Sequence, residues 1–185
     1  MSEPNQLYAR VRLSRPRFAE FVAAPFPDPS DDPEVLAWLA EAQYYGPRYT
    51  PERIRSNVVE GTTTIGAYLE SLAGPGAWGI TMPCRNSYDE ASQTWTLAIL
   101  DFSENYDDYI AAVAVLRAAA KYKDLPGDDG VVIYGFMFEN GFELALRIVP
   151  GSSHFLPEEQ SAVLIEEAAA TIQALMDEAA AASAG

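Results

Sequence analysis

The chain has 185 residues, and its 27 acidic side chains outnumber 12 lysines and arginines, so that its formal net charge at pH 7 is −15. A field of this sign repels nucleic acids and anionic membranes and attracts basic partners. The length and an apolar fraction of 49% predict one folded domain over 1–185 with a substantial core, and with flexible ends at 1–6 and 179–185.

The cysteine content and the first residues indicate where the protein works. The single cysteine, Cys84, excludes an internal disulfide and a Cys-rich zinc module, which fits a reducing compartment. Residues 1–6 carry an acid and no apolar run, so no secretory signal is expected, and no segment offers roughly eighteen uninterrupted apolar residues for a membrane span. We therefore expect a soluble, cytoplasmic protein without a metal or cofactor.

The first half of the chain predicts one strand followed by short helices. Residues 7–13 alternate apolar and polar side chains, which is typical of a half-buried strand. Ser14 is suited to cap a helix over 15–24, and the turn-rich segment 26–33 then interrupts the chain.

Two Pro-containing signals start the next helices. Asp32 stands at an N-cap position before Pro33, and Thr50 stands in the same way before Pro51. The second signal predicts a helical region that runs to about residue 73.

The second half predicts strands at 77–82 and 94–102 and a helix that Asn105 caps. The apolar run 131–149 is interrupted by Asn140-Gly141, which predicts a hairpin with a two-residue type I′ turn. In that register Ile133 faces Ile148, and Phe138 faces Glu143. The second face of this hairpin serves either as core beneath a helix or as a binding platform, and it carries the aromatic residues Tyr134, Phe136 and Phe138.

Pro157 opens a last helix that runs from Glu158 to about Glu178, with an apolar stripe at Leu164, Ala168, Ile172 and Leu175. Hairpins separated by single helices predict an α+β domain: a mostly antiparallel sheet of about five strands with helices packed on it and a long C-terminal helix.

Two patterns suggest catalysis. Residues 74–79 match G-x-G-x-x-G, which occurs in dinucleotide-binding sites between a strand and a helix. Here the segment follows a predicted helix and precedes a predicted strand, so we interpret it as an ordinary turn.

Cys84 would become a nucleophile if His154 lay beside it and Arg85 lowered its pKa. No flanking signature supports this pair, and we expect a structural cysteine and a surface-loop histidine. A single histidine also argues against a zinc site.

The charges are arranged unevenly. The stretches 18–47, 86–116 and 148–185 hold six acids each and no lysine or arginine. Many of these acids stand at predicted helix starts, where each stabilises the helix dipole by roughly 0.3–1 kcal/mol. Adjacent acids, which would also suit acid–base cleavage of glycosides, occur at 31/32, 107/108, 158/159 and 166/167. The missing cations favour a basic partner, and the arginines gather in and after the first strand, at Arg10, Arg12, Arg15 and Arg17.

A small, acidic α+β domain without a catalytic constellation resembles the immunity proteins that bacteria encode beside toxins delivered to rival cells. This resemblance implies a non-enzymatic protein, monomeric in the complex with its partner, that binds a basic toxin acting in the cytoplasm and occludes it after electrostatic steering. The candidate partner-binding residues are Asp28, Asp31, Asp32, Asp101, Glu104, Asp107, Asp108, Phe138 and Glu143.

Three other functions stay open. The order helix, strand, strand, helix, strand, strand, helix from about Thr50 is similar to that of acidic secretion chaperones, which are usually homodimers. A small enzyme would use Cys84 and His154 or an acidic pair. A structural scaffold is the last alternative, and sequence alone does not separate it from the immunity class.

Overall fold

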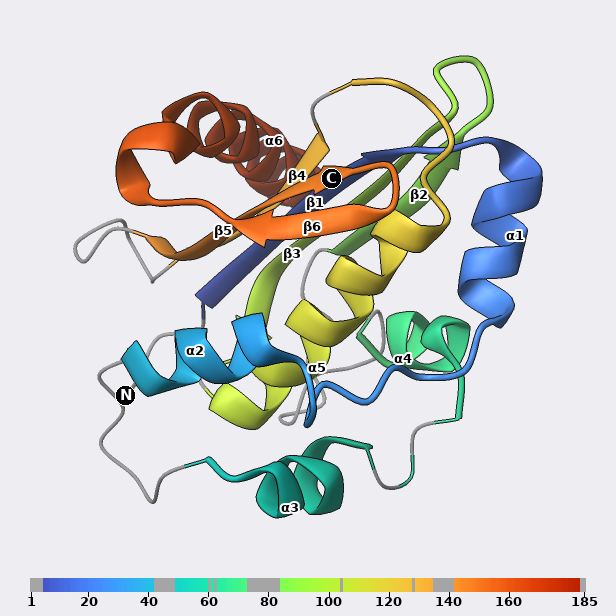
Figure 1. The fold of residues 1–185 in the computed structure, drawn as a ribbon. Helices are drawn as coiled ribbons and strands as arrows, with labels where there is room; N and C mark the ends of the chain where they lie inside the picture. Colours follow the sequence, from blue (N-terminus) through green and yellow to red (C-terminus); the bar gives the residue numbers. More distant parts are fainter. Residues whose placement is uncertain are drawn as a thin grey trace.

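Six antiparallel strands in the order β2-β3-β1-β4-β5-β6 form the centre of the computed structural model (Figure 1). The prediction of an α+β fold with a mostly antiparallel sheet is confirmed, with six strands rather than five. The strands are β1 (Asn5–Arg12), β2 (Cys84–Asp89), β3 (Thr94–Ser103), β4 (Asp129–Tyr134), β5 (Phe142–Val149) and β6 (Ser152–Phe155). The structure describes residues 5–41, 49–59, 61, 63–72, 84–103, 105–127, 129–134 and 142–183.

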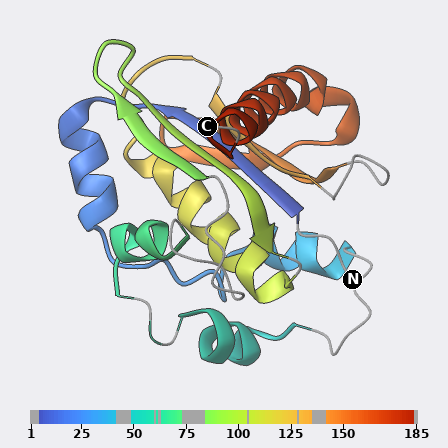
Figure 2. The ribbon, with the colours of Figure 1, turned by 180° about the vertical axis from the view of Figure 1, so that it is seen from behind.

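Helices cover both faces of this sheet. The long C-terminal helix α6 (Glu158–Ser183) packs on one face, and the remaining helices lie on the other (Figures 1 and 2). These are α1 (Arg15–Ala23), α2 (Pro33–Glu41), α3 (Pro51–Ile54), the π-helical turn η1 (Arg55–Val59), α4 (Ile65–Leu72), α5 (Tyr106–Ala118) and the 3-10 turn η2 (Ala119–Lys121).

The predicted N-caps of α2, α3 and α5 are confirmed. Asp32 Oδ1 accepts from the backbone N–H groups of Glu34 and Val35 at 2.9 and 3.2 Å. The Thr50 hydroxyl accepts from the Arg53 N–H at 3.3 Å, and Asn105 caps α5 in the same way. Each cap satisfies N–H groups that a helix start leaves without a partner.

Ser14 stands at the N-cap of α1, but the prediction that its side chain caps this helix is wrong. Its hydroxyl donates instead to Asp124 Oδ2 at 2.6 Å, and its backbone N–H donates to Asp124 Oδ1 at 2.8 Å. Asp124 therefore holds the start of α1 to the segment after α5.

We predict that Asp124→Ala destabilises the protein at neutral pH and that this effect narrows as the pH falls below about 4. Partial burial raises the pKa of the Asp124 carboxyl, but the hydrogen bonds from Ser14 lower it by more, so that this pKa lies below its usual value. A depressed folded-state pKa gives stability that is present above the unfolded-state pKa and is lost as the carboxyl protonates. Urea unfolding of both proteins between pH 3 and pH 7 measures this difference. A gap that stays constant or widens toward pH 3 would contradict the prediction, and Asp177→Ala on the exposed side of α6 is the control.

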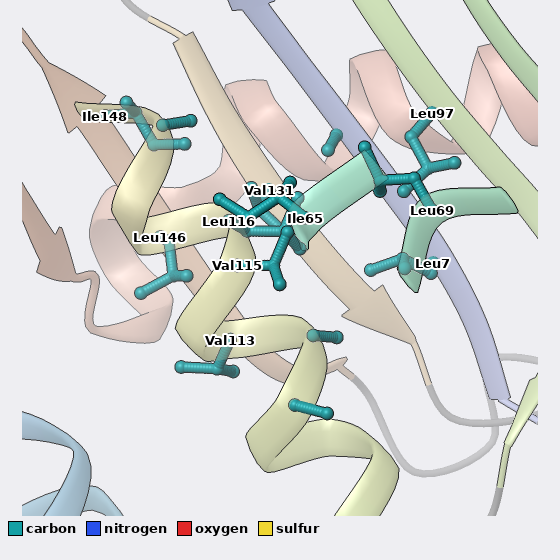
Figure 3. Packing of buried hydrophobic residues seen from close by; sticks show 14 of the residues in the cluster. Leu7, Ile65, Leu69, Leu97, Val113, Val115, Leu116, Val131, Leu146 and Ile148 are labelled. Carbon is teal, nitrogen blue, oxygen red and sulfur yellow. The ribbon is translucent and has the colours of Figure 1, made fainter. Parts of the chain in front are cut away.

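The main core lies between the sheet and α5, with α4 beside them (Figure 3). Leu7, Ala9 and Val11 alternate along β1 toward this core, whereas Tyr8 faces α6. Helix α5 is apolar nearly all round, because the sheet covers one side of it and the outer helical segments cover others. Its polar residues are confined to its two ends, which is where the charged groups described below gather.

The second core lies beneath α6. The predicted stripe is confirmed, since Ala168, Ile172 and Leu175 are buried against small or flat residues of the sheet and Leu164 packs at their edge. Gly130 of β4 lets the helix approach closely: a Cβ built there would lie 2.5 Å from a methyl carbon of Leu164. The sheet residues of this core are Tyr8, Ala98, Val132 and Ala145.

The predicted register of the β4–β5 hairpin is wrong. Ile133 pairs with Leu144 instead of Ile148, and Glu143 lies between partners of β4 rather than opposite Phe138. The two registers differ by an even number of residues, so the same side chains stay on the apolar face, and alternation alone does not distinguish them. On its other side β4 pairs with β1, where Leu7 lies opposite Ile133. The Asn140-Gly141 turn and the aromatic residues Phe136 and Phe138 lie outside the described residues.

Two edge strands were not predicted. Cys84–Asp89 forms β2, and its mostly polar sequence gave no apolar alternation because an edge strand buries little. The segment Ser152–Phe155, where we expected His154 to lie in a surface loop, forms β6 after a turn at Gly151, whose φ is 81°. The strand predicted at 77–82 and the glycine motif at 74–79 lie outside the described residues.

Candidate functional site

The structure ties two of the predicted loop acids to one arginine. Asp28 and Asp31 lie between α1 and α2, and both accept from Arg55 of η1, at 3.3 and 2.8 Å. Asp28 also accepts from the Ser30 N–H at 2.9 Å. Burial raises the pKa of the Asp28 carboxyl, but the hydrogen bonds from Ser30 and the charge of Arg55 outweigh burial and hold this pKa below its usual value. These carboxylates are already compensated within the chain.

The third loop acid, Asp32, belongs to a chain of charged groups around Arg117 of α5. Arg117 Nε lies 3.1 Å from Asp32 Oδ2, and its Nη2 lies 2.7 Å from Glu34 Oε2. Glu34 Oε1 is 3.5 Å from His154 Nδ1 on β6. Arg117 is 13% exposed and lies over the Phe155 ring. Sequence reasoning did not find this group, because its members come from three distant segments: the start of α2, the end of α5 and β6.

The Arg117 group borders a cavity of about 570 Å³ between the α1–α2 loop, the end of α5 and β6. Arg117 and Lys121 bring positive charge to this cavity and Asp28, Asp32 and Glu34 bring negative charge. The acids of the wall are paired with arginines, so the wall carries little net charge of its own.

The other predicted acids gather where β3 ends and α5 begins. Asp108 Oδ2 accepts from the Ser103 hydroxyl at 2.5 Å, and Asp107 Oδ2 accepts from the Asn57 side chain at 3.2 Å. Asp101 lies on the last part of β3. No lysine or arginine in the described ranges forms an ion pair with any of these three acids. The second oxygen of Asp107 is buried without a hydrogen bond.

The turn η1 lies between the two acidic groups. Its Arg55 binds the loop acids, and its Asn57 binds Asp107. The structure therefore brings the loop acids and the acids at the start of α5 to the same side of the sheet, opposite α6. Of the remaining predicted residues, Glu104 and Phe138 lie outside the described residues, and only the strand position of Glu143 in β5 is described.

An aromatic row crosses the same side of the molecule. The ring of Trp38 on α2 stacks on Phe155 and on Tyr106, with centroid separations of 5.6 and 6.2 Å. All three rings are partly exposed. The row leads from the Arg117 group to the acids at the start of α5. We define the partner face as Asp101, Asp107 and Asp108 together with Trp38, Tyr106 and Phe155.

The concentration of arginines around β1 has an internal explanation. Arg10 pairs with Glu167 of α6 at 2.7 Å, and Arg12 pairs with Asp129 at 2.9 Å. Arg85 of β2 pairs with Glu178 near the end of α6, also at 2.7 Å. The placement of these cations thus follows from pairing within the fold, so it gives no independent support for a partner.

The proposed pair of Cys84 and His154 does not form. Cys84 lies on β2 and His154 on β6, at opposite edges of the sheet. Since neighbouring strands are about 4.8 Å apart, five strand spacings separate them by about 24 Å. Burial also raises the pKa of Cys84, which disfavours a reactive thiolate. Adjacent acids diverge as well: Asp31 binds Arg55 while Asp32 binds Arg117.

Within the described ranges, no three His, Cys, Asp or Glu side chains come together in a way that would hold a metal ion. None of the helices described is both long and apolar enough to cross a membrane. The chain matches no family model, no curated protein and no solved structure.

Proposed function

We propose that this chain is a binding protein of the immunity class, which recognises a basic toxin in the cytoplasm through the partner face and occludes it. The observation that carries the proposal is the contrast between the two acidic groups. Asp28, Asp31 and Asp32 are compensated by arginines of the chain itself, whereas Asp101, Asp107 and Asp108 have no such partner in the described ranges.

A carboxylate without an ion-pair partner destabilises the free protein little while water solvates it. Such a carboxylate contributes most to binding when a partner brings a cation to it. In this proposal the acids at the start of α5 steer the partner and then pair with its basic residues.

The aromatic row gives the same face its apolar contact area. Trp, Tyr and Arg side chains dominate the binding energy of protein interfaces, and here Trp38 and Tyr106 lie beside the acids while Arg117 lies over the Phe155 ring. A charged rim beside partly exposed rings suits occlusion of a basic active site better than it suits catalysis.

The test uses the product of the adjacent gene as the first candidate partner. We expect Asp101→Lys with Asp108→Lys to lower the association rate constant by tenfold or more at low salt and to flatten its salt dependence, because electrostatic steering acts on encounter. Stopped-flow or surface plasmon resonance measurements between roughly 20 and 300 mM salt give both quantities. This range includes the physiological ionic strength of about 150 mM.

The matched control is Glu159→Lys with Glu166→Lys, which makes the same charge change on the exposed side of α6. An equal fall of the association rate constant in both variants would mean that the net charge of the protein, and not the partner face, steers the encounter. A gene neighbour that does not bind, or a free chain that is a homodimer by light scattering, would count against the immunity class, and the second result would favour a secretion chaperone.

A further inference from the structure

A second cavity, of about 250 Å³, lies on the opposite side of the sheet, beneath the first turns of α6. Arg10, Gly130 and Arg147 form one row across its floor, because Gly130 of β4 pairs with Arg10 on one side and with Arg147 on the other. Since strands are about 4.8 Å apart, the Cα atoms of the two arginines lie about 10 Å apart. The glycine between them leaves room for Leu164 of α6.

The acids at this cavity are already bound. Glu167 Oε1 accepts from the Tyr8 hydroxyl at 2.5 Å and lies 2.7 Å from Arg10 Nη1. Burial, and then the hydrogen bond to Glu167, raise the pKa of Tyr8, so that its hydroxyl stays a donor. Asp129, whose side chain is fully buried, pairs with Arg12 and with Lys123.

Arg147 is different from these neighbours. It lines the cavity, and within the described part of the chain its guanidinium forms no ion pair or hydrogen bond. The lining of the cavity thus holds the arginines Arg10 and Arg147 and the carboxylates Glu167 and Asp129. Both carboxylates already pair with other cations of the chain, which leaves the charge of Arg147 without a counter-charge in the described residues.

The wall that α6 contributes is apolar. Leu156, Val163 and Leu164 line the cavity. Val163 is 80% exposed, which leaves a large apolar side chain in contact with water beside the cavity. A bound apolar group would remove this surface from water, which stabilises a complex by about 25 cal/mol for each Å² buried.

We propose that this cavity binds a small organic monocarboxylate, whose charge pairs with Arg147 and whose apolar part covers Val163. The guanidinium presents donors in a fork that matches a carboxylate, and one unpaired arginine is suited to one negative charge. The size of the cavity admits only a small molecule. The site is separate from the partner face, so the proposal does not depend on the proposed function.

Calorimetric titration with hexanoate, acetate, hexanamide and hexylamine tests both halves of the proposal. We expect hexanoate to bind at least tenfold more tightly than hexanamide, which lacks the charge, and than acetate, which lacks the apolar part. Hexylamine should not bind measurably. Arg147→Gln should weaken hexanoate binding tenfold or more, and Val163→Asp should abolish it.

Arg15→Gln and Ala174→Asp make the same charge changes on α1 and farther along α6, and they should leave hexanoate affinity within twofold of the unaltered chain. Circular dichroism and thermal unfolding of each variant confirm that it is folded. Equal affinity for hexanoate and hexanamide, an unchanged affinity in Arg147→Gln, or no binding of hexanoate by the unaltered chain would each overturn the proposal.

Discussion

Asp129→Ala is expected to lower the free energy of unfolding by about 3–5 kcal/mol, which is a large part of the stability of a domain of this size. The side chains of Asp129 and Lys123 are both fully buried, and they pair with each other. Asp129 also accepts from the backbone N–H and the Nε of Arg12, each at 2.9 Å. Removing the carboxylate leaves a buried ammonium group without its counter-charge, which is the most costly way to break an ion pair.

Urea unfolding at pH 7 measures this loss, and Glu20→Ala is the control. Glu20 pairs with Arg17 on the exposed side of α1, where such a pair contributes at most about 1 kcal/mol. The double variant Lys123→Met with Asp129→Leu should recover part of the lost stability, because it removes the unpaired buried ammonium group, while the donors of Arg12 stay without their acceptor. If Asp129→Ala costs no more than Glu20→Ala, the pair contributes little to folding.

Trp95→Ala should cost about 3–5 kcal/mol, since it removes the largest buried side chain between β3 and α1. The ring lies 5.3 Å from that of Phe21 and 6.1 Å from that of Phe18, measured between centroids. Its Nε1 donates to Asn86 Oδ1 at 2.9 Å, which also ties β2 to β3. The substitution therefore opens a cavity at the point where α1 meets the sheet.

Trp38→Ala is the matched comparison, because Trp38 is only partly buried on the partner face. Thermal or urea unfolding should show a clearly smaller loss for Trp38→Ala than for Trp95→Ala. Binding should show the reverse order: under the proposed function Trp38→Ala weakens the partner complex, while Trp95→Ala weakens it only through unfolding. Similar stability losses for both tryptophans would contradict this division between core and surface.

Local signals predicted most of the helices. Asp32, Thr50 and Asn105 each satisfy N–H groups a few residues away, so their role depends only on the adjacent sequence. The apolar stripe of α6 was likewise a local pattern, confirmed by the burial of Ala168 and Ile172. Such interactions are visible in one sequence because both partners lie within one or two helical turns.

The failures lie where distant segments decide the outcome. The alternation within 131–149 fits several β4–β5 registers equally well, and β4 also pairs with β1, which is more than a hundred residues earlier in the chain. The same limit applies to the candidate site. The sequence shows that Asp28 and Asp107 carry negative charge. Whether an arginine pairs with each of them depends on the positions of η1 and α5 in the fold.

The two ion pairs between the sheet and α6 have a consequence for how this helix finds its place. Its buried stripe of Leu164, Ala168, Ile172 and Leu175 sets which face of the helix meets the sheet. Glu167 and Glu178 lie about 16 Å apart along the helix, and they meet Arg10 and Arg85 on different strands. A slip by one turn, about 5.4 Å, would separate both pairs at once. The two ion pairs therefore favour one axial position of α6 on the sheet.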